Sequence, residues 1–163
     1  MIIKYTIKDY KKYKKEILKH IDSMPFIRSE TNPGTEVSKS DWCLTSVFKR
    51  PYVEPFMKMI DPFVNYIQKE YEIKLQINVM WYSQYYKGDF HNWHTHPHAH
   101  FSNVFYLEMP KGTPGTEFKH IEQKFDVKEG DILSFPAFML HRGPKITSNK
   151  RKTVIVFDTT FHS

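Results

Sequence analysis

The chain has 163 residues, of which 40% are hydrophobic and 16% aromatic, and its formal net charge is +6. This length suits one domain with a core that needs no disulfide, and the single cysteine, Cys43, excludes an internal one. Uncharged apolar stretches such as residues 132–140 are too short to cross a bilayer, and the first residues do not have the pattern of a signal peptide. We therefore expect a cytoplasmic protein in a reducing compartment, with no membrane partner.

Helical patterns come first along the chain. Over residues 9–24 apolar side chains recur every three or four positions with lysines between them, which predicts an amphipathic helix with Asp9 at its N-cap. Residues 29–39 predict a loop, because they contain Asn-Pro-Gly and have little periodicity. Residues 53–71 predict a second helix that breaks at Asp61-Pro62, so that residues 62–71 form its regular part.

Strand patterns follow. Apolar and polar residues alternate over residues 73–82, which predicts a strand with one buried face. Turn-rich segments at 110–115 and 143–149 separate further predicted strands at 101–108, 116–120, 123–127, 131–135, 139–141 and 152–161. Helices that precede short strands predict an α+β fold, with residues 1–72 as mainly helical support and residues 73–163 as a sandwich or barrel-like core of a single domain.

Histidines form the most informative cluster. Five of the nine fall within residues 91–100. On an extended chain, His94 and His96 point to the same face and can present two imidazoles to one metal ion. His141 ends a distant apolar stretch, where a buried polar ring needs a partner, so it is the candidate third ligand. Such a set leaves coordination positions open, as non-haem Fe(II) oxygenases require.

Residues 77–161 resemble the superfamily of 2-oxoglutarate and Fe(II)-dependent dioxygenases, in particular its small members with a Gly-Asp…His-x-His-Pro segment. The resemblance rests on Tyr85-x-x-Gly88, His94-Thr-His96, Ser102-Asn-Val-Phe-Tyr-Leu107 with Pro110, Gly130-Asp-Ile-Leu-Ser-Phe-Pro136, His141 and Arg151-Lys-Thr153. It implies a double-stranded β-helix, or jelly roll, with helices packed on one side. It also implies that O2 and 2-oxoglutarate react at Fe(II), giving succinate and a hydroxylated substrate. The implied substrate is a small molecule, an amino acid or a peptide.

The same resemblance implies roles for particular residues. His94 and His141 correspond to iron ligands, and Arg151 and Thr153 to anchors for the far carboxylate of 2-oxoglutarate. Tyr85 corresponds to a hydroxyl donor to the same carboxylate. A guanidinium suits this task, since it is permanently charged and matches a carboxylate with two parallel N–H bonds.

One position departs from the superfamily pattern, because His96 stands where an Asp or Glu is expected. We favour His96 as the third ligand, which leaves one more positive charge at the site and favours anionic cosubstrates. The alternatives are a carboxylate from Asp89, Glu108 or Glu117, or a site with only two protein ligands.

Other interpretations remain open. With Gly88, His94, His96 and His100 as one motif, the chain also resembles a cupin, which implies a three-histidine metalloenzyme that does not use 2-oxoglutarate. A non-catalytic metal-binding or assembly module is a further alternative. The lysines of residues 4–19 favour a solvated helix face over a nucleic-acid partner, because no nucleic-acid motif accompanies them. Five aromatic residues are candidates to line a pocket: Trp81, Trp93, Phe101, Tyr106 and Phe138. The primary substrate and the oligomeric state are left open.

Overall fold

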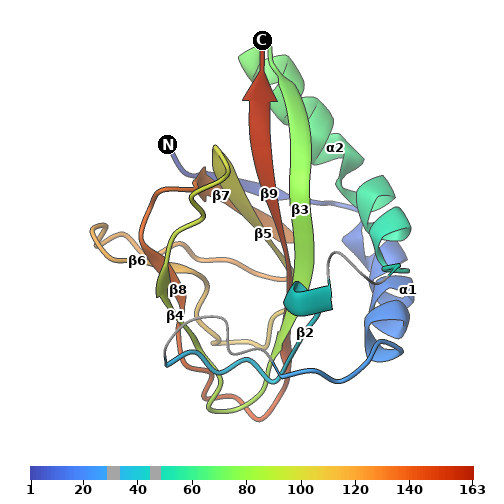
Figure 1. The fold of residues 1–163 in the computed structure, drawn as a ribbon, viewed down its shortest axis with the longest axis vertical. Helices are drawn as coiled ribbons and strands as arrows, with labels where there is room; N and C mark the ends of the chain where they lie inside the picture. The colour runs from blue at the N-terminus through green and yellow to red at the C-terminus, as the bar shows by residue number, and fades with distance from the viewer. Residues whose placement is uncertain (29–33, 45–48) are drawn as a thin grey trace.

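Two helices cover one face of a six-stranded sheet, and a three-stranded sheet faces its other side (Figure 1). The computed structural model describes residues 1–28, 34–44 and 49–163. The elements are β1 (Ile3–Thr6), α1 (Tyr10–Asp22), β2 (Lys39–Ser40), the 3-10 helix η1 (Trp42–Leu44), α2 (Val53–Tyr71), β3 (Lys74–Tyr85), β4 (His91–His94), β5 (Phe101–Glu108), β6 (Glu117–Phe118), β7 (Asp131–Pro136), β8 (His141–Gly143) and β9 (Lys152–His162).

The sheets have the strand order β1-β7-β5-β9-β3-β2 and β4-β8-β6, and their strand pairs are antiparallel. In sequence order the chain moves between the two sheets, so that strands distant in sequence become neighbours. This is the α+β double-stranded β-helix with helices on one side that the sequence led us to expect.

Both predicted helices form, but the predicted break in the second does not. Asp9 occupies the N-cap position of α1 without a side-chain capping bond. α2 continues through Pro62, and Asp61 accepts a hydrogen bond from the Asn65 side chain within the helix instead of starting a new one. A proline inside a helix costs about 3 kcal/mol. Burial of one continuous apolar face outweighs that cost, since α2 packs Phe56, Met59, Ile60, Phe63 and Ile67 against the sheet.

The strand prediction was partly wrong. Residues 123–127 form no strand, although Val127 is buried, and the short strands β1, β2 and β4 were not predicted as such. β1 and β2 are edge strands that gain their structure by pairing with β7 and β3, which local sequence does not reveal. The predicted loop at residues 29–39 lies partly outside the described residues.

The core has two layers, one on each face of the large sheet. Between helices and sheet lie side chains such as Tyr82, Phe105 and Phe157. Between the two sheets lie their neighbours along the same strands, such as Trp81, Tyr106 and Val156. Because side chains alternate along a strand, each central strand contributes side chains to both layers. Among the described residues, no helix has the length and apolar character needed to cross a membrane.

Candidate metal centre

Three histidines converge between the two sheets. His94 ends β4 and is paired with His141, which begins β8. His96 follows β4, where its backbone N–H donates to the carbonyl of Ala137. The candidate ligand atoms of the three side chains all lie within 4.8 Å of one another. The structure thus brings together the three histidines that the sequence nominated as metal ligands.

Backbone carbonyls orient two of the rings. Nδ1 of His94 lies 2.7 Å from the carbonyl oxygen of Asn92, and Nδ1 of His141 lies 2.8 Å from that of Met139. A carbonyl only accepts, so each Nδ1 carries the proton and donates it. Each Nε2 then keeps its lone pair, which is the form in which a histidine binds a metal.

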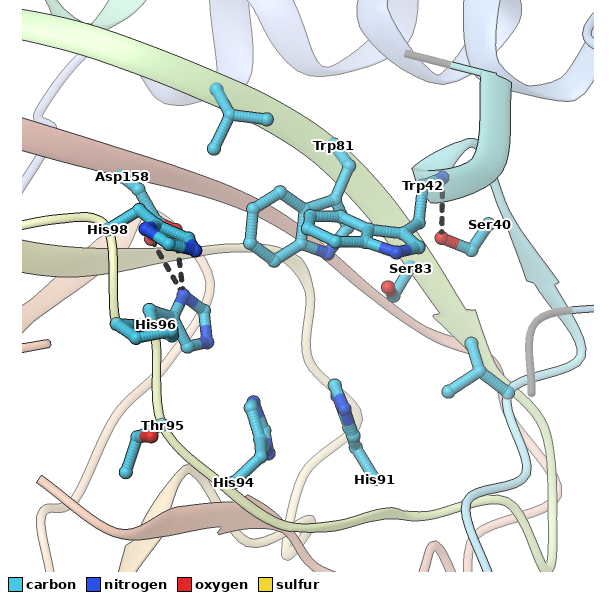
Figure 2. Close-up of a pocket in the computed structure, with 13 residues that line it drawn as sticks. Ser40, Trp42, Trp81, Ser83, His91, His94, Thr95, His96, His98 and Asp158 are labelled. Carbon is cyan, nitrogen blue, oxygen red and sulfur yellow. Dashed lines mark hydrogen bonds and ion pairs between the residues drawn. The ribbon is translucent and has the colours of Figure 1, made fainter. Parts of the chain in front are cut away.

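A carboxylate orients the third ring. Nδ1 of His96 lies 2.8 Å and 2.9 Å from the two carboxylate oxygens of Asp158 on β9, as the dashed lines in Figure 2 show. The hydroxyl of Ser102 lies 3.2 Å from the same nitrogen. All three rings are therefore held through Nδ1, and the set fits a divalent metal ion bound through three Nε2 atoms.

The surroundings also favour neutral imidazoles. Burial lowers the pKa of His94 to about 4 and that of His141 to about 2. The ring of His91 stacks on that of His94 at 3.8 Å, and burial lowers the pKa of His91 to about 3. Since metal and proton compete for the same nitrogen, rings that stay neutral near pH 7 are ready to bind a metal. Three nitrogen ligands leave coordination positions for other molecules.

Two cavities adjoin the histidines. The inner cavity, of about 40 Å³, lies between the sheets and is lined by Tyr85, Tyr106, Thr116 and Lys152. The outer cavity, of about 350 Å³, is lined by Trp42, Thr95 and His98. Both share Trp81, Ser83, His91, His94 and His96 as walls. A metal bound by the three histidines would therefore lie where the two cavities meet.

Two cations line the inner cavity: Arg142, which is paired with Glu117, and Lys152, which has no carboxylate partner among the described residues. Lys152 is 3% exposed, and its ammonium donates to the carbonyl of Pro114 at 3.1 Å. The ammonium also lies 5.5 Å from the ring centre of Tyr85 and 5.6 Å from that of Tyr106. Burial lowers the pKa of Lys152 to about 8. A bound anion would offset that desolvation, so the inner cavity suits a ligand with a carboxylate.

Arg151 and Thr153 point to the other side of β9. The guanidinium of Arg151 donates to Glu108 at 2.7 Å and to Asp22, at the end of α1, at 3.0 Å. The hydroxyl of Thr153 donates to Glu108 and accepts from Gln84. The structure therefore does not bring these two residues to the histidines, and of the three cosubstrate residues nominated from the sequence only Tyr85 lines the inner cavity.

The outer cavity is walled by tryptophans. Trp42 of η1 and Trp81 of β3 meet edge to face, with ring centres 4.5 Å apart, above the imidazoles of His91 and His94 in Figure 2. Asp41 fixes the segment that carries Trp42, because its buried carboxylate accepts hydrogen bonds from the Tyr52 hydroxyl and the Tyr82 backbone N–H. The aromatic wall is thus tied to the strand that also supplies Trp81.

Other nominated residues lie elsewhere. Asp89 accepts from the backbone N–H groups of Ser38 and Tyr86, while Glu108 and Glu117 pair with arginines. His100 accepts from the backbone of Phe161 and does not belong to the histidine cluster. Of the aromatic candidates, Trp81 and Tyr106 line the cavities near the histidines. The remaining three are not among the residues that line either cavity: Trp93, Phe101 and the exposed Phe138.

Sequence reasoning missed Lys152, Asp158 and Trp42. A signal existed for the first two, because Lys152, Val154, Val156 and Asp158 occupy alternate positions of one predicted strand and so share a face. Trp42 had no such signal, since it reaches the cavity through the short pairing of β2 with β3.

Comparisons with known proteins identify the fold. No protein-family model matches the chain, and no curated protein matches it. Solved structures do. A viral collagen prolyl hydroxylase from Paramecium bursaria Chlorella virus-1, in complex with 2-oxoglutarate, is similar at 16% identity and a TM-score of 0.68, over 97% of this chain and 94% of that one. A 2-oxoglutarate-Fe(II) oxygenase family protein from Burkholderia pseudomallei gives 11% identity and a TM-score of 0.70, over 98% and 84%.

A third similar structure is a prolyl hydroxylase from Trichoplax adhaerens in complex with a peptide fragment of hypoxia inducible factor. It shares 10% identity and a TM-score of 0.68, over 98% of this chain and 83% of that one. With identities this low, the structural similarity establishes a common fold and nothing more. The chain thus has the fold of 2-oxoglutarate-Fe(II) oxygenases, as the sequence resemblance implied.

Proposed function

We propose that the chain is a 2-oxoglutarate- and Fe(II)-dependent dioxygenase that hydroxylates a small molecule, an amino acid or a peptide. The observation that carries this proposal is the cluster of His94, His96 and His141, with ligand atoms within 4.8 Å and every Nδ1 engaged. When bound, Fe(II) supplies the oxidative chemistry with O2, and the protein supplies binding, orientation and exclusion of water.

The inner cavity is the proposed site of 2-oxoglutarate. We assign the far carboxylate of this cosubstrate to the Lys152 ammonium, assisted by the Tyr85 hydroxyl, in place of Arg151 and Thr153. The assignment is supported by the burial of Lys152 and by its place beside the histidines. A carboxylate in contact would hold the proton on the ammonium, giving a charge-assisted bond in a site of low dielectric constant.

The outer cavity is the proposed site of the primary substrate. Its lining, within the part of the chain that the structure describes, contains no lysine or arginine, and its one carboxylate, Asp158, is paired with His96. Its apolar wall comes from Trp42 and Trp81 together with Val37, Val79 and Pro97. This lining favours an uncharged, largely apolar group of the substrate next to the metal.

One observation favours a second candidate, a three-histidine metalloenzyme that does not use 2-oxoglutarate. The inner cavity of about 40 Å³ has room for roughly one to three water molecules, less than a five-carbon dicarboxylate needs. Binding of 2-oxoglutarate therefore requires the side chains around Lys152 to move apart, or the cosubstrate to extend into the space shared with the outer cavity.

Anaerobic titration separates the candidates. The Fe(II)-loaded protein should bind 2-oxoglutarate by calorimetry and, on exposure to air, release succinate as 2-oxoglutarate is consumed. His141→Ala should abolish both, because it removes a metal ligand. Metal binding without 2-oxoglutarate binding would favour the second candidate. A protein that binds neither Fe(II) nor 2-oxoglutarate would refute the proposal and favour a non-catalytic module.

A further inference from the structure

We propose that Asp158 supplies, through His96, the negative charge that a carboxylate ligand would otherwise place on the metal. Asp158 is then a positioning residue whose charge sets the metal affinity of a three-histidine site. This inference rests on the metal site of the proposed function and goes beyond it, because it assigns a role to a residue outside the ligand set.

Asp158 contacts one particular candidate ligand, His96. Both carboxylate oxygens of Asp158 lie within 2.9 Å of Nδ1 of His96, and the two side chains are 8% and 9% exposed. His94 and His141 instead donate to neutral backbone carbonyls. The only ligand backed by a charge is thus the one that stands where the superfamily pattern has an Asp or Glu.

The carboxylate of Asp158 is buried. A buried carboxylate is costly unless a positive group compensates it. Among the ion pairs of the described residues, its partner is the His96 imidazole, with no lysine or arginine beside it. An imidazole whose Nε2 binds a divalent cation becomes a stronger donor at Nδ1 and carries part of the metal's charge. The metal therefore completes the compensation that this buried carboxylate needs.

The large sheet holds the contact between Asp158 and His96 in place. Asp158 is paired with Ser102 of β5 and faces the space between the sheets. The Ser102 hydroxyl lies 3.2 Å from the same His96 nitrogen. A ligand held from a central strand keeps its orientation before the metal binds, which reduces the cost of ordering it.

A double-mutant cycle on metal affinity tests the inference. Co(II) affinity is measured by competition with a chromophoric chelator for the unmodified protein, Asp158→Asn, His96→Asp and the double variant. Asp158→Asn keeps the shape and one acceptor oxygen but removes the charge, and should weaken Co(II) binding about 10–100-fold. In the His96→Asp background the metal already has a carboxylate ligand, so Asp158→Asn should change the affinity less than about twofold or strengthen it, because neighbouring carboxylates repel.

An equal loss in both backgrounds would overturn the inference, because it would show that Asp158 acts on the fold and not through His96. A matched pair guards against a misfolded Asn variant. Asp158→Glu keeps the charge and should stay within about threefold of the unmodified affinity, while Asp158→Gln, of the same size, should show the loss. Equal affinities of the Glu and Gln variants would also overturn the inference.

The outcome is distinguishable from failure of the proposed function. If the cycle behaves as expected and 2-oxoglutarate does not bind, the role of Asp158 stands and the cosubstrate assignment falls. If 2-oxoglutarate binds and Asp158→Asn leaves the Co(II) affinity unchanged, only the role of Asp158 falls. A protein that binds no Co(II) would overturn both.

Discussion

The two faces of β9 differ in what they do. On one face, Lys152 and Asp158 flank two valines and point towards the histidines. On the other, Thr153, Ile155 and Phe157 point towards the helices, on the side where Arg151 bonds to Asp22 at the end of α1. Residues next to each other in sequence therefore serve separate layers, and the alternation of the strand decides which of two adjacent cations meets the cavity.

The two faces of β9 also differ in whether they contribute mainly to stability or to binding. The helix face is built mainly of apolar side chains, whereas the cavity face holds a buried ammonium, a buried carboxylate and neutral imidazoles. Changes on the helix face should lower the stability of the whole fold and spare the site. Changes on the cavity face should alter binding, metal affinity and the response to pH.

The largest expected effect of a single substitution on stability is on the helix face. Phe157 is fully buried and packs edge to face against Phe56 and Phe63 of α2. Phe157→Ala should lower the free energy of unfolding by about 3–5 kcal/mol, measured by urea denaturation, because it leaves a cavity in the core. The Co(II) affinity of the folded variant should stay within about twofold of that of the unmodified protein. A loss above tenfold would contradict the separation of stability and binding between the two faces.

Acid should lower the stability of the fold through the buried histidines on the cavity side. Burial holds the pKa values of His91, His94 and His141 at about 3, 4 and 2, below the ordinary value near 6.5. The unfolded chain therefore takes up protons first, so stability is lost as the pH falls from about 6.5 towards 4. Each histidine contributes at most about 1.4 kcal/mol per pH unit.

Urea denaturation of the metal-free protein between pH 7 and pH 5 measures this slope. His141→Leu should reduce the slope by roughly one third, since it removes one of three such groups. A slope that is unchanged in this variant would show that the acid sensitivity comes from elsewhere in the molecule.

The smallest expected effect concerns the bonds of Arg151. Glu108 accepts from both Arg151 and Thr153 beside the helix layer, and the Arg151 and Glu108 side chains are 24% and 21% exposed. Glu108→Gln should lower the free energy of unfolding by about 1 kcal/mol or less, because the pair is partly solvated. Its affinity for 2-oxoglutarate should match that of the unmodified protein, and a tenfold loss would indicate that Arg151 takes part in binding 2-oxoglutarate.

Much of the fold was predictable because its patterns are local. The spacing of apolar residues located α1 and α2, and the change to alternation located β3. The proline break in α2 was predicted wrongly, since the intrinsic cost of Pro62 is local and the packing that offsets it is not. The edge strands β1 and β2 were missed for the same reason.

The candidate site was predictable only in part. His94 and His96 lie two residues apart, so an extended chain alone brings them to one face. The sequence prediction named Arg151 and did not consider Lys152, and pattern alone does not separate them, because both faces of β9 are buried and its residues 154–157 are apolar throughout. In such a strand alternation shows which residues share a face but not which face meets the site. The contact of Asp158 with His96 joins residues 62 positions apart and leaves no local trace.

Binding of 2-oxoglutarate to two neighbouring variants tests the central claim most directly. Lys152→Met and Arg151→Met each replace a cation with an uncharged side chain of similar length. Calorimetry on the anaerobic Fe(II)-loaded proteins compares their affinities for 2-oxoglutarate. If only the cavity face of β9 binds 2-oxoglutarate, Lys152→Met should weaken binding about 10–100-fold, the loss expected for a buried charge-assisted bond, and Arg151→Met should change it less than about twofold. A larger loss of affinity in Arg151→Met, or an equal loss in both variants, would contradict the assignment of 2-oxoglutarate binding to the cavity face.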